Sequence, residues 1–188
     1  MKIAVYCGSR EGTNFQIIQK AKELGKWIGE EGHTLVYGAS AKGLMGAVAD
    51  AVLEAGGEVI GIIPEFLTDV DPIHSGLTQL EIVEDMSCRK KRMIDLADVA
   101  IAIPGGPGTL EEISEVISWS IIGHTDTQAI TYNMEGFYDP LQAMYQQMVK
   151  CGYLSQEAHE AIHFATSMGD VERLIKGGQN EKREVKHP

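Results

Sequence analysis

Short apolar runs alternate along the chain with longer segments in which apolar residues recur at helical spacing. A short apolar run is typical of a buried strand, and apolar positions three and four apart are typical of a helix packed on one side. The predicted strands are Ile3–Cys7, Thr34–Tyr37, Glu58–Ile63, Leu80–Val83, Val99–Ile103 and Ala129–Tyr132. The predicted helices are Phe15–Glu30, Leu44–Glu54, Asp85–Ala97, Leu110–Ile122, Asp139–Lys150 and Asp170–Lys176.

The alternation of strand and helix predicts an α/β fold, with a Rossmann-like, doubly wound and mostly parallel sheet and helices on both of its faces. A chain of 188 residues suits one domain with a sizeable core, and we expect residues 1–178 to form a single nucleotide-binding domain. Residues 179–188 are polar and charged, which predicts a flexible tail. Ligands of such sheets bind beyond the carboxyl ends of the strands, so the loops after the strands are the place to seek a site.

Composition excludes several classes of function. The net charge of −11 argues against a nucleic-acid partner, because affinity for a phosphate backbone comes from Lys and Arg. The three cysteines form no Cys-x-x-Cys pair, and His159 and His163 have no further ligand beside them, so neither a disulfide framework nor a metal site is predicted. No apolar run reaches membrane-spanning length and no signal peptide precedes the first strand. We therefore expect a cytoplasmic protein without a membrane partner.

The loop after the fifth predicted strand carries the most specific chemical pattern. It has the sequence PGGPGT over Pro104–Thr109 and leads into a helix. Glycines allow a backbone to approach a ligand closely, and the unpaired N–H groups at a helix start attract anions. The loop therefore predicts a phosphate site, and the alternative is a tight turn that binds nothing. The pattern is neither a Walker loop nor the dinucleotide fingerprint.

Glu112 has two interpretations. Thr109 and Glu112 match a capping box, in which the two side chains only satisfy backbone N–H groups. The preceding helix favours a chemical role, because Arg89 and Lys90 flank its apolar stripe. An arginine there points toward the core or a cleft and requires a carboxylate or phosphate partner, whereas Lys90 can also extend its amine to solvent.

Two further loops contain candidate contacts. Lys42–Gly46 begins a helix with a glycine on either side of Leu-Met, which fits close packing and close approach to a ligand equally well. Asp71 follows the third strand, from which it can reach a cleft, although most loop aspartates only cap or turn.

Two motifs carry a resemblance to a known family. Residues 104–112, PGGPGTLEE, resemble the PGGxGTxxE signature of the LOG (Lonely Guy) family of cytokinin-activating phosphoribohydrolases, and Met86–Lys90 resembles its MxxRK motif. Further similar segments are 5–9, 43–51 and 57–64. One departure follows the second strand, where the family usually has three glycines and this chain has Gly38, Ala39 and Ser40. The added side chains would narrow the cleft or change which base fits.

The resemblance implies hydrolysis of the N-glycosidic bond of a nucleoside 5′-monophosphate, either a cytokinin riboside monophosphate or AMP, to free base and ribose 5-phosphate. Arg89 and Glu112 would be the catalytic pair. The substrate-binding residues would be Asp71, Lys90, Gly105, Gly106, Pro107, Gly108, Thr109, Leu110 and Glu111. The resemblance also implies a homodimer that binds a small-molecule nucleotide and needs no cofactor or metal.

Two other functions stay open. The same fold can carry a nucleotide or a phosphorylated cofactor without turnover, as molybdenum-cofactor carriers of similar fold do, but the presence of both Arg89 and Glu112 favours an enzyme. Lysine decarboxylase is a description that such sequences have often received. That activity requires pyridoxal phosphate on a lysine, and no lysine here stands in a recognisable anchoring context.

Overall fold

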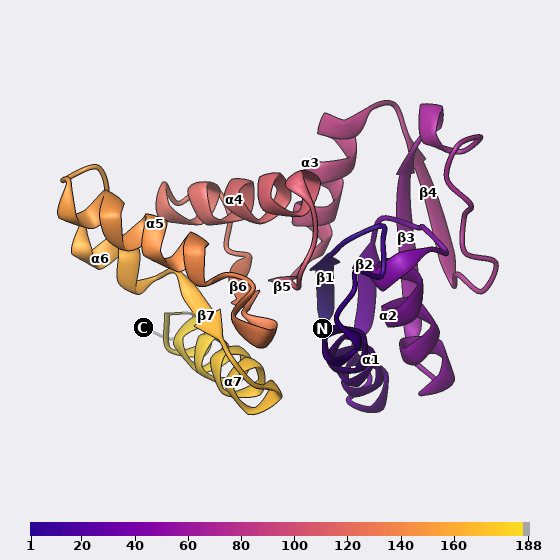
Figure 1. Ribbon diagram of the computed structural model, residues 1–188, viewed down its shortest axis with the longest axis horizontal. Helices are drawn as coiled ribbons and strands as arrows, with labels where there is room; N and C mark the ends of the chain where they lie inside the picture. The colour runs from indigo at the N-terminus through magenta and orange to yellow at the C-terminus, as the bar shows by residue number, and fades with distance from the viewer. Residues whose placement is uncertain (186–188) are drawn as a thin grey trace.

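The computed structural model describes residues 1–185, with side chains described as far as Gly178. Its strands form one sheet in the order β4-β3-β2-β1-β5-β6-β7, and every neighbouring pair is parallel (Figure 1). The strands are β1 (Lys2–Tyr6), β2 (Thr34–Tyr37), β3 (Glu58–Pro64), β4 (Gln79–Val83), β5 (Val99–Ala102), β6 (Gln128–Tyr132) and β7 (His163–Ala165). The predicted fold class is confirmed.

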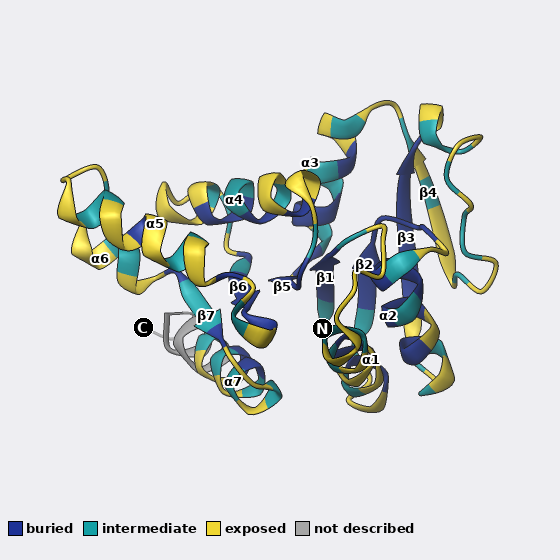
Figure 2. Cartoon of the chain, viewed as in Figure 1, coloured by how far each residue is buried: buried dark blue, intermediate teal, exposed yellow. Residues whose placement is uncertain are grey.

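Helices cover both faces of the sheet, and each face has its own apolar core. One core is formed with α1 (Phe15–Glu30), α2 (Gly43–Glu54) and α7 (Met168–Val185). The other is formed with α3 (Met86–Leu96), α4 (Pro107–Ile121) and α5 (Asp139–Lys150). Shorter elements are α6 (Gln156–Glu160) and the 3₁₀ turns η1 (Glu65–Leu67) and η2 (Met134–Gly136). Figure 2 shows the central strands buried between these layers, while β4 at the edge is partly exposed.

Two short elements were not predicted, because β7 and α6 contain only three and five residues and carry no readable period. They separate His159, in α6, from His163, in β7, so the two histidines do not share a helix. The pair Asp139-Pro140 is typical of an N-cap followed by the first helical residue, but the fifth long helix has a different N-cap. Tyr138 is its N-cap, which makes Asp139 the first helical residue.

The last helix is longer than predicted. We expected it to end at Lys176, but α7 continues to Val185, so helical backbone covers much of the stretch predicted as a tail. Residues 186–188 of that predicted tail lie outside the described residues. Within the part of the chain that is described, no helix combines the length and apolar character needed to cross a bilayer.

The sheet order fixes where a ligand can bind. The chain runs from β1 toward β2 on one side and from β5 toward β6 on the other, so the topology reverses between the neighbours β1 and β5. The loops after these two strands meet at that point, where the Gly8 N–H donates a hydrogen bond to the Pro104 carbonyl oxygen at 3.2 Å. Doubly wound sheets bind ligands in the crevice at such a switch point.

Candidate active site

A cavity of about 640 Å³ opens at the carboxyl ends of the central strands. Its walls come from the loops after β1 and β3, from α3 and from the first turns of α4. The predicted site residues that line it are Asp71, Arg89, Gly106, Pro107, Gly108, Thr109, Glu111 and Glu112. Lys90, Gly105 and Leu110 lie outside its lining.

The helix that follows the glycine-rich turn begins earlier than predicted. Pro107 is its first residue and Gly106 its N-cap, so the proline stands where a helix needs no N–H donor. Thr109 is therefore inside the helix rather than its cap, and Thr109 and Glu112 form no capping box. The interpretation of Glu112 as a capping residue is wrong. The first turn of the helix lines the cavity, and its free N–H groups and positive dipole end favour an anion there.

The glycines of this turn have different surroundings. A Cβ atom added at Gly105 would lie 2.1 Å from Thr109 Oγ1 and 2.9 Å from the Gly8 nitrogen, so this glycine lets the turn pack against the β1 loop. Added at Gly106 or Gly108, it would meet no protein atom within 4 Å. These two glycines therefore leave open space at the start of α4 that a ligand group can enter.

Arg89 lies on the buried side of α3, as its place beside the apolar stripe predicted. The residue is only 9% exposed. Its guanidinium packs against the backbone of Gly38, where an added Cβ atom would lie 1.8 Å from Nη2, and its Nη1 contacts Met86 Sδ at 3.8 Å. Among the described residues, Nε has no hydrogen-bond partner and no carboxylate lies within ion-pair distance of the guanidinium. The expected protein partner is absent there, and the cation faces the cavity without a paired anion.

Glu112 is half-buried on the second turn of α4 and lines the same cavity. Burial raises the pKa of its carboxyl to about 7, against the opposing influence of the Arg89 guanidinium. The carboxyl can therefore gain or lose a proton near neutral pH, as acid–base residues of active sites do. Burial, followed by the charge of Glu112, also raises the pKa of the neighbouring Cys7 thiol, which stays protonated.

Lys90 joins the two helices that carry Arg89 and Glu112. Its Nζ is 2.7 Å from Glu111 Oε1 and 3.2 Å from Glu115 Oε2. The hydrogen bond to Glu111 is the main reason that the pKa of Lys90 is raised. Lys90 and Glu111, both predicted to contact the substrate, contact each other in this structure, and their ion pair links α3 to α4.

The residues that replace family glycines after β2 do not line the cavity. Ala39 adopts a left-handed backbone with φ of 66° and is buried, with its Cβ 2.8 Å from the place where a Cβ atom on Gly61 would lie. Ser40 is also buried and bonds to Asp71. The expectation that the two side chains narrow the cleft is therefore not met. Asp71, by contrast, reaches the cavity as predicted.

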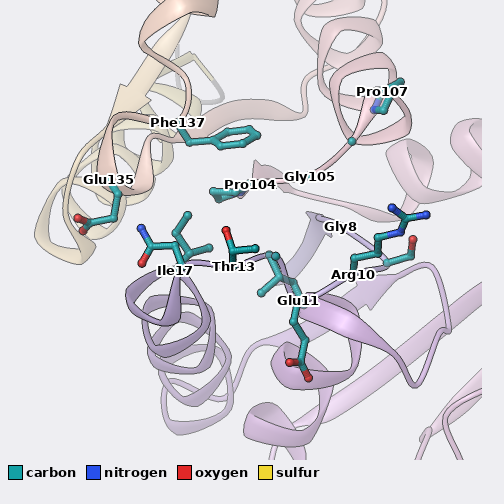
Figure 3. Close-up of a pocket in the computed structure, with 15 residues that line it drawn as sticks. Gly8, Arg10, Glu11, Thr13, Ile17, Pro104, Gly105, Pro107, Glu135 and Phe137 are labelled. Atoms are coloured by element: carbon teal, nitrogen blue, oxygen red, sulfur yellow. The ribbon is translucent and has the colours of Figure 1, made fainter.

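A second cavity of about 760 Å³ adjoins the first and shares its residues at Gly8–Arg10 and at Gly106 and Pro107. In Figure 3 Ile17 of α1 lies near Glu135, and Phe137 lies above them, across from Thr13. It is the larger cavity, but neither Arg89 nor Glu112 lines it.

Several cavity residues were not predicted as site residues, including Arg10 and Met45. The only feature of the sequence that could have pointed to them is the glycines close to both residues, Gly8 and Gly12 beside Arg10 and Gly43 and Gly46 beside Met45. Lys42–Gly46 supports the packing interpretation, because a Cβ atom added at Gly43 would lie 2.4 Å from the Ser9 carbonyl carbon. Within the described residues, no three His, Cys, Asp or Glu side chains gather to hold a metal ion.

Comparisons with known proteins agree with these motifs. Residues 45–175 match the family model described as "possible lysine decarboxylase". A probable cytokinin riboside 5′-monophosphate phosphoribohydrolase of Oryza sativa subsp. japonica is 34% identical over 184 residues, covering 98% of this chain and 82% of the relative. The cytokinin riboside 5′-monophosphate phosphoribohydrolase of Rhodococcoides fascians is 38% identical over 161 residues, covering 85% and 81%.

Solved structures with this fold include the molybdenum cofactor carrier protein of Chlamydomonas reinhardtii, with a TM-score of 0.73, 20% identity and coverage of 95% of this chain and 98% of that one. At that identity the likeness establishes the fold alone. The sequence relatives are closer and span most of both chains. The chain therefore belongs to the LOG family of cytokinin riboside 5′-monophosphate phosphoribohydrolases, as its two motifs predicted.

Proposed function

We propose that this protein hydrolyses the N-glycosidic bond of a nucleoside 5′-monophosphate, giving free base and ribose 5-phosphate. The observation that carries the proposal is the buried, carboxylate-free Arg89 in one cavity with Glu112, whose pKa is raised to about 7. A structural arginine would have a protein anion beside it, whereas this one is available to a substrate. The relatives named above carry the same activity in their names.

The start of α4, Glu112 and Arg89 have different roles in the proposed reaction. The start of α4 holds the phosphate through its N–H groups, in the open space beside Gly106 and Gly108. When the bond from C1′ to the base breaks, positive charge develops on the ribose, and the ionised Glu112 stabilises it. Glu112 then accepts a proton from the water that bonds to C1′ and passes it to the departing base, which regenerates the carboxylate. Arg89 stabilises negative charge on the phosphate or the departing base.

The direct test is release of free base, measured by chromatography after incubation with AMP and with isopentenyladenosine monophosphate. We expect release from at least one of them. A thermal shift with AMP but no release from either would instead favour a carrier of nucleotides or phosphorylated cofactors. Comparison of the two rates would establish which base is preferred.

The pKa of Glu112 predicts how activity depends on pH. The carboxylate form is the active one in the proposed mechanism, so kcat/KM should rise as the pH increases through about 7 and then level off. Measurement from pH 5.5 to 8.5 would check this. A profile that falls across the same range would assign Glu112 the role of a proton donor instead.

Gly106 provides a test of the phosphate position. Gly106→Ala should fold normally, because φ at this residue is −91° and the new methyl group meets no protein atom within 4 Å. The methyl group would occupy the space of the phosphate, so we expect AMP affinity to fall by about tenfold or more. Calorimetry and thermal unfolding would measure the two effects. Gly105→Ala is the contrast, because its methyl group collides with Thr109 and should lower stability. Unchanged AMP affinity in Gly106→Ala would contradict a phosphate at this turn.

The description "possible lysine decarboxylase" implies pyridoxal phosphate on a lysine, and the residues present do not fit that cofactor. Lys90 is held by two carboxylates that raise its pKa, which disfavours the neutral amine that a Schiff base needs. Lys42, at the cavity rim, is exposed rather than desolvated.

Two properties implied by the family resemblance remain predictions. A homodimer is expected, and the mass of the protein in solution by light scattering would check it. A cytoplasmic location is also expected, and cell fractionation would check that.

A further inference from the structure

The loops after β2 and β3 are joined at one wall of the cavity. The Ala41 N–H donates to the Pro72 carbonyl oxygen at 2.8 Å, and the His74 N–H donates to the Ala39 carbonyl oxygen at 2.9 Å. Between these contacts Ser40 pairs with the other loop as an isolated antiparallel bridge. The two loops therefore hold Ser40 and its neighbours in a fixed register.

In this register the Ser40 side chain forms a hydrogen bond with the Asp71 carboxylate. Ser40 is completely buried, and its Oγ donates to Asp71 Oδ1 at 3.0 Å while accepting the Lys42 N–H at 3.2 Å. Asp71 is half-buried and lines the cavity that contains Arg89 and Glu112. The hydroxyl thus fixes the carboxylate through one oxygen, and a carboxylate bonded in this way retains acceptor capacity on the other.

We infer that Ser40 is a positioning residue, which holds Asp71 as the acceptor for hydroxyl groups of the ribose. The inference rests on the proposed function. An ionised carboxylate only accepts hydrogen bonds and repels a phosphate, so its partner in a nucleotide must be a neutral donor. The sugar supplies such donors in every ribonucleotide, whatever its base. A family glycine at position 40 has no hydroxyl to provide this contact.

The consequence is discrimination between ribose and 2′-deoxyribose. A 2′-deoxynucleotide leaves the fixed carboxylate without a partner, and sites built to bond a hydroxyl reject analogues that lack it. Without the Ser40 hydroxyl, Asp71 is free to rotate toward solvent. The affinity for AMP should then fall, while the affinity for 2′-deoxy-AMP should change little.

The test measures binding of AMP and 2′-deoxy-AMP by calorimetry in the Glu112→Gln background, where turnover does not interfere. We expect the parent to prefer AMP by about tenfold or more, and Ser40→Ala to reduce that preference to about threefold or less. In an Asp71→Asn background, Ser40→Ala should have almost no further effect on the ratio. Ser155→Ala is the matched control, because it removes a hydroxyl that caps a backbone N–H of α6 and lies outside the cavity.

An unchanged preference in Ser40→Ala would overturn the inference. Equal losses for both nucleotides would also overturn it, because they would indicate a general loosening of the loops. The proposed hydrolysis is tested separately, by base release from the wild-type protein. If no base is released, the ratio of the AMP and 2′-deoxy-AMP affinities can still be measured. Absence of AMP binding to the Glu112→Gln parent would overturn the inference, whereas the proposed hydrolysis is decided by base release from the wild-type protein.

Discussion

Replacement of Glu112 by glutamine is expected to stabilise the protein while removing nearly all base release. The carboxyl titrates near 7 in the folded protein and near its ordinary value of 4.5 when unfolded. The folded state therefore binds the extra proton between these values, and stability falls as the pH rises from about 4.5 to about 7. Glutamine never ionises, so at pH 8 we expect the unfolding free energy to increase by roughly 1–3 kcal/mol. Turnover should fall by about 10²- to 10⁴-fold.

Denaturant unfolding at pH 8 and at pH 5 would measure the stability change, which should be much smaller at the lower pH. Glu58→Gln is the matched control, because Glu58 is exposed at the amino end of β3, away from the cavity. It should change neither property. A Glu112→Gln protein that keeps its activity would eliminate Glu112 as the catalytic carboxylate, whatever its stability.

Replacement of Arg89 by methionine should remove activity and AMP affinity with little cost to folding. A buried arginine in a salt bridge leaves an unpaired carboxylate when it is removed, which costs about 3–5 kcal/mol. Arg89 has no such partner among the described residues, so we expect the unfolding free energy to change by no more than about 1 kcal/mol. Loss of the only buried guanidinium among the described cavity residues should lower kcat/KM by about 10²-fold or more.

Arg92→Met provides the control on the same helix. Arg92 binds Glu81 through two hydrogen bonds on the sheet edge and lies outside the cavity, so its loss should lower stability slightly and leave base release intact. A loss of several kcal/mol in Arg89→Met would show that the arginine has a structural partner. Removal of Arg89 should also raise the pKa of Glu112 further, because the guanidinium lowers it in the wild-type protein.

Most of the fold was predictable because its strands and long helices carry their own periodicity. The parallel sheet follows from the alternation of apolar runs with helices, and the burial of Arg89 follows from its place beside a helical stripe. The short β7 and α6 carry no such signal, since packing rather than local preference defines them. The end of α7 was missed because its last residues are polar and show no apolar stripe at helical spacing.

The contacts within the candidate site were harder to predict from the sequence than the fold. The whole PGGPGT turn was predicted to be a loop, although the helix already begins at Pro107. Because the predicted helix began too late, Thr109 was placed at the N-cap and Glu112 was interpreted as its capping partner. The Lys90–Glu111 pair and the Ser40–Asp71 bond were not predicted, since each joins residues about 20 to 30 positions apart. Such contacts depend on how neighbouring elements are placed, which periodicity does not describe.

The division of the cavity between helices and loops has an evolutionary consequence. Arg89 and Glu112 stand on α3 and α4, which share one apolar core and are tied together by Lys90. Ser40 and Asp71 stand on the loops after β2 and β3, and loops vary more in sequence than the helices and strands that they connect. Substitutions in those loops can therefore change which nucleotide is bound while the residues that carry out the reaction stay the same. Substitutions at Ser40 and its neighbours would let a protein engineer alter selectivity in the same way.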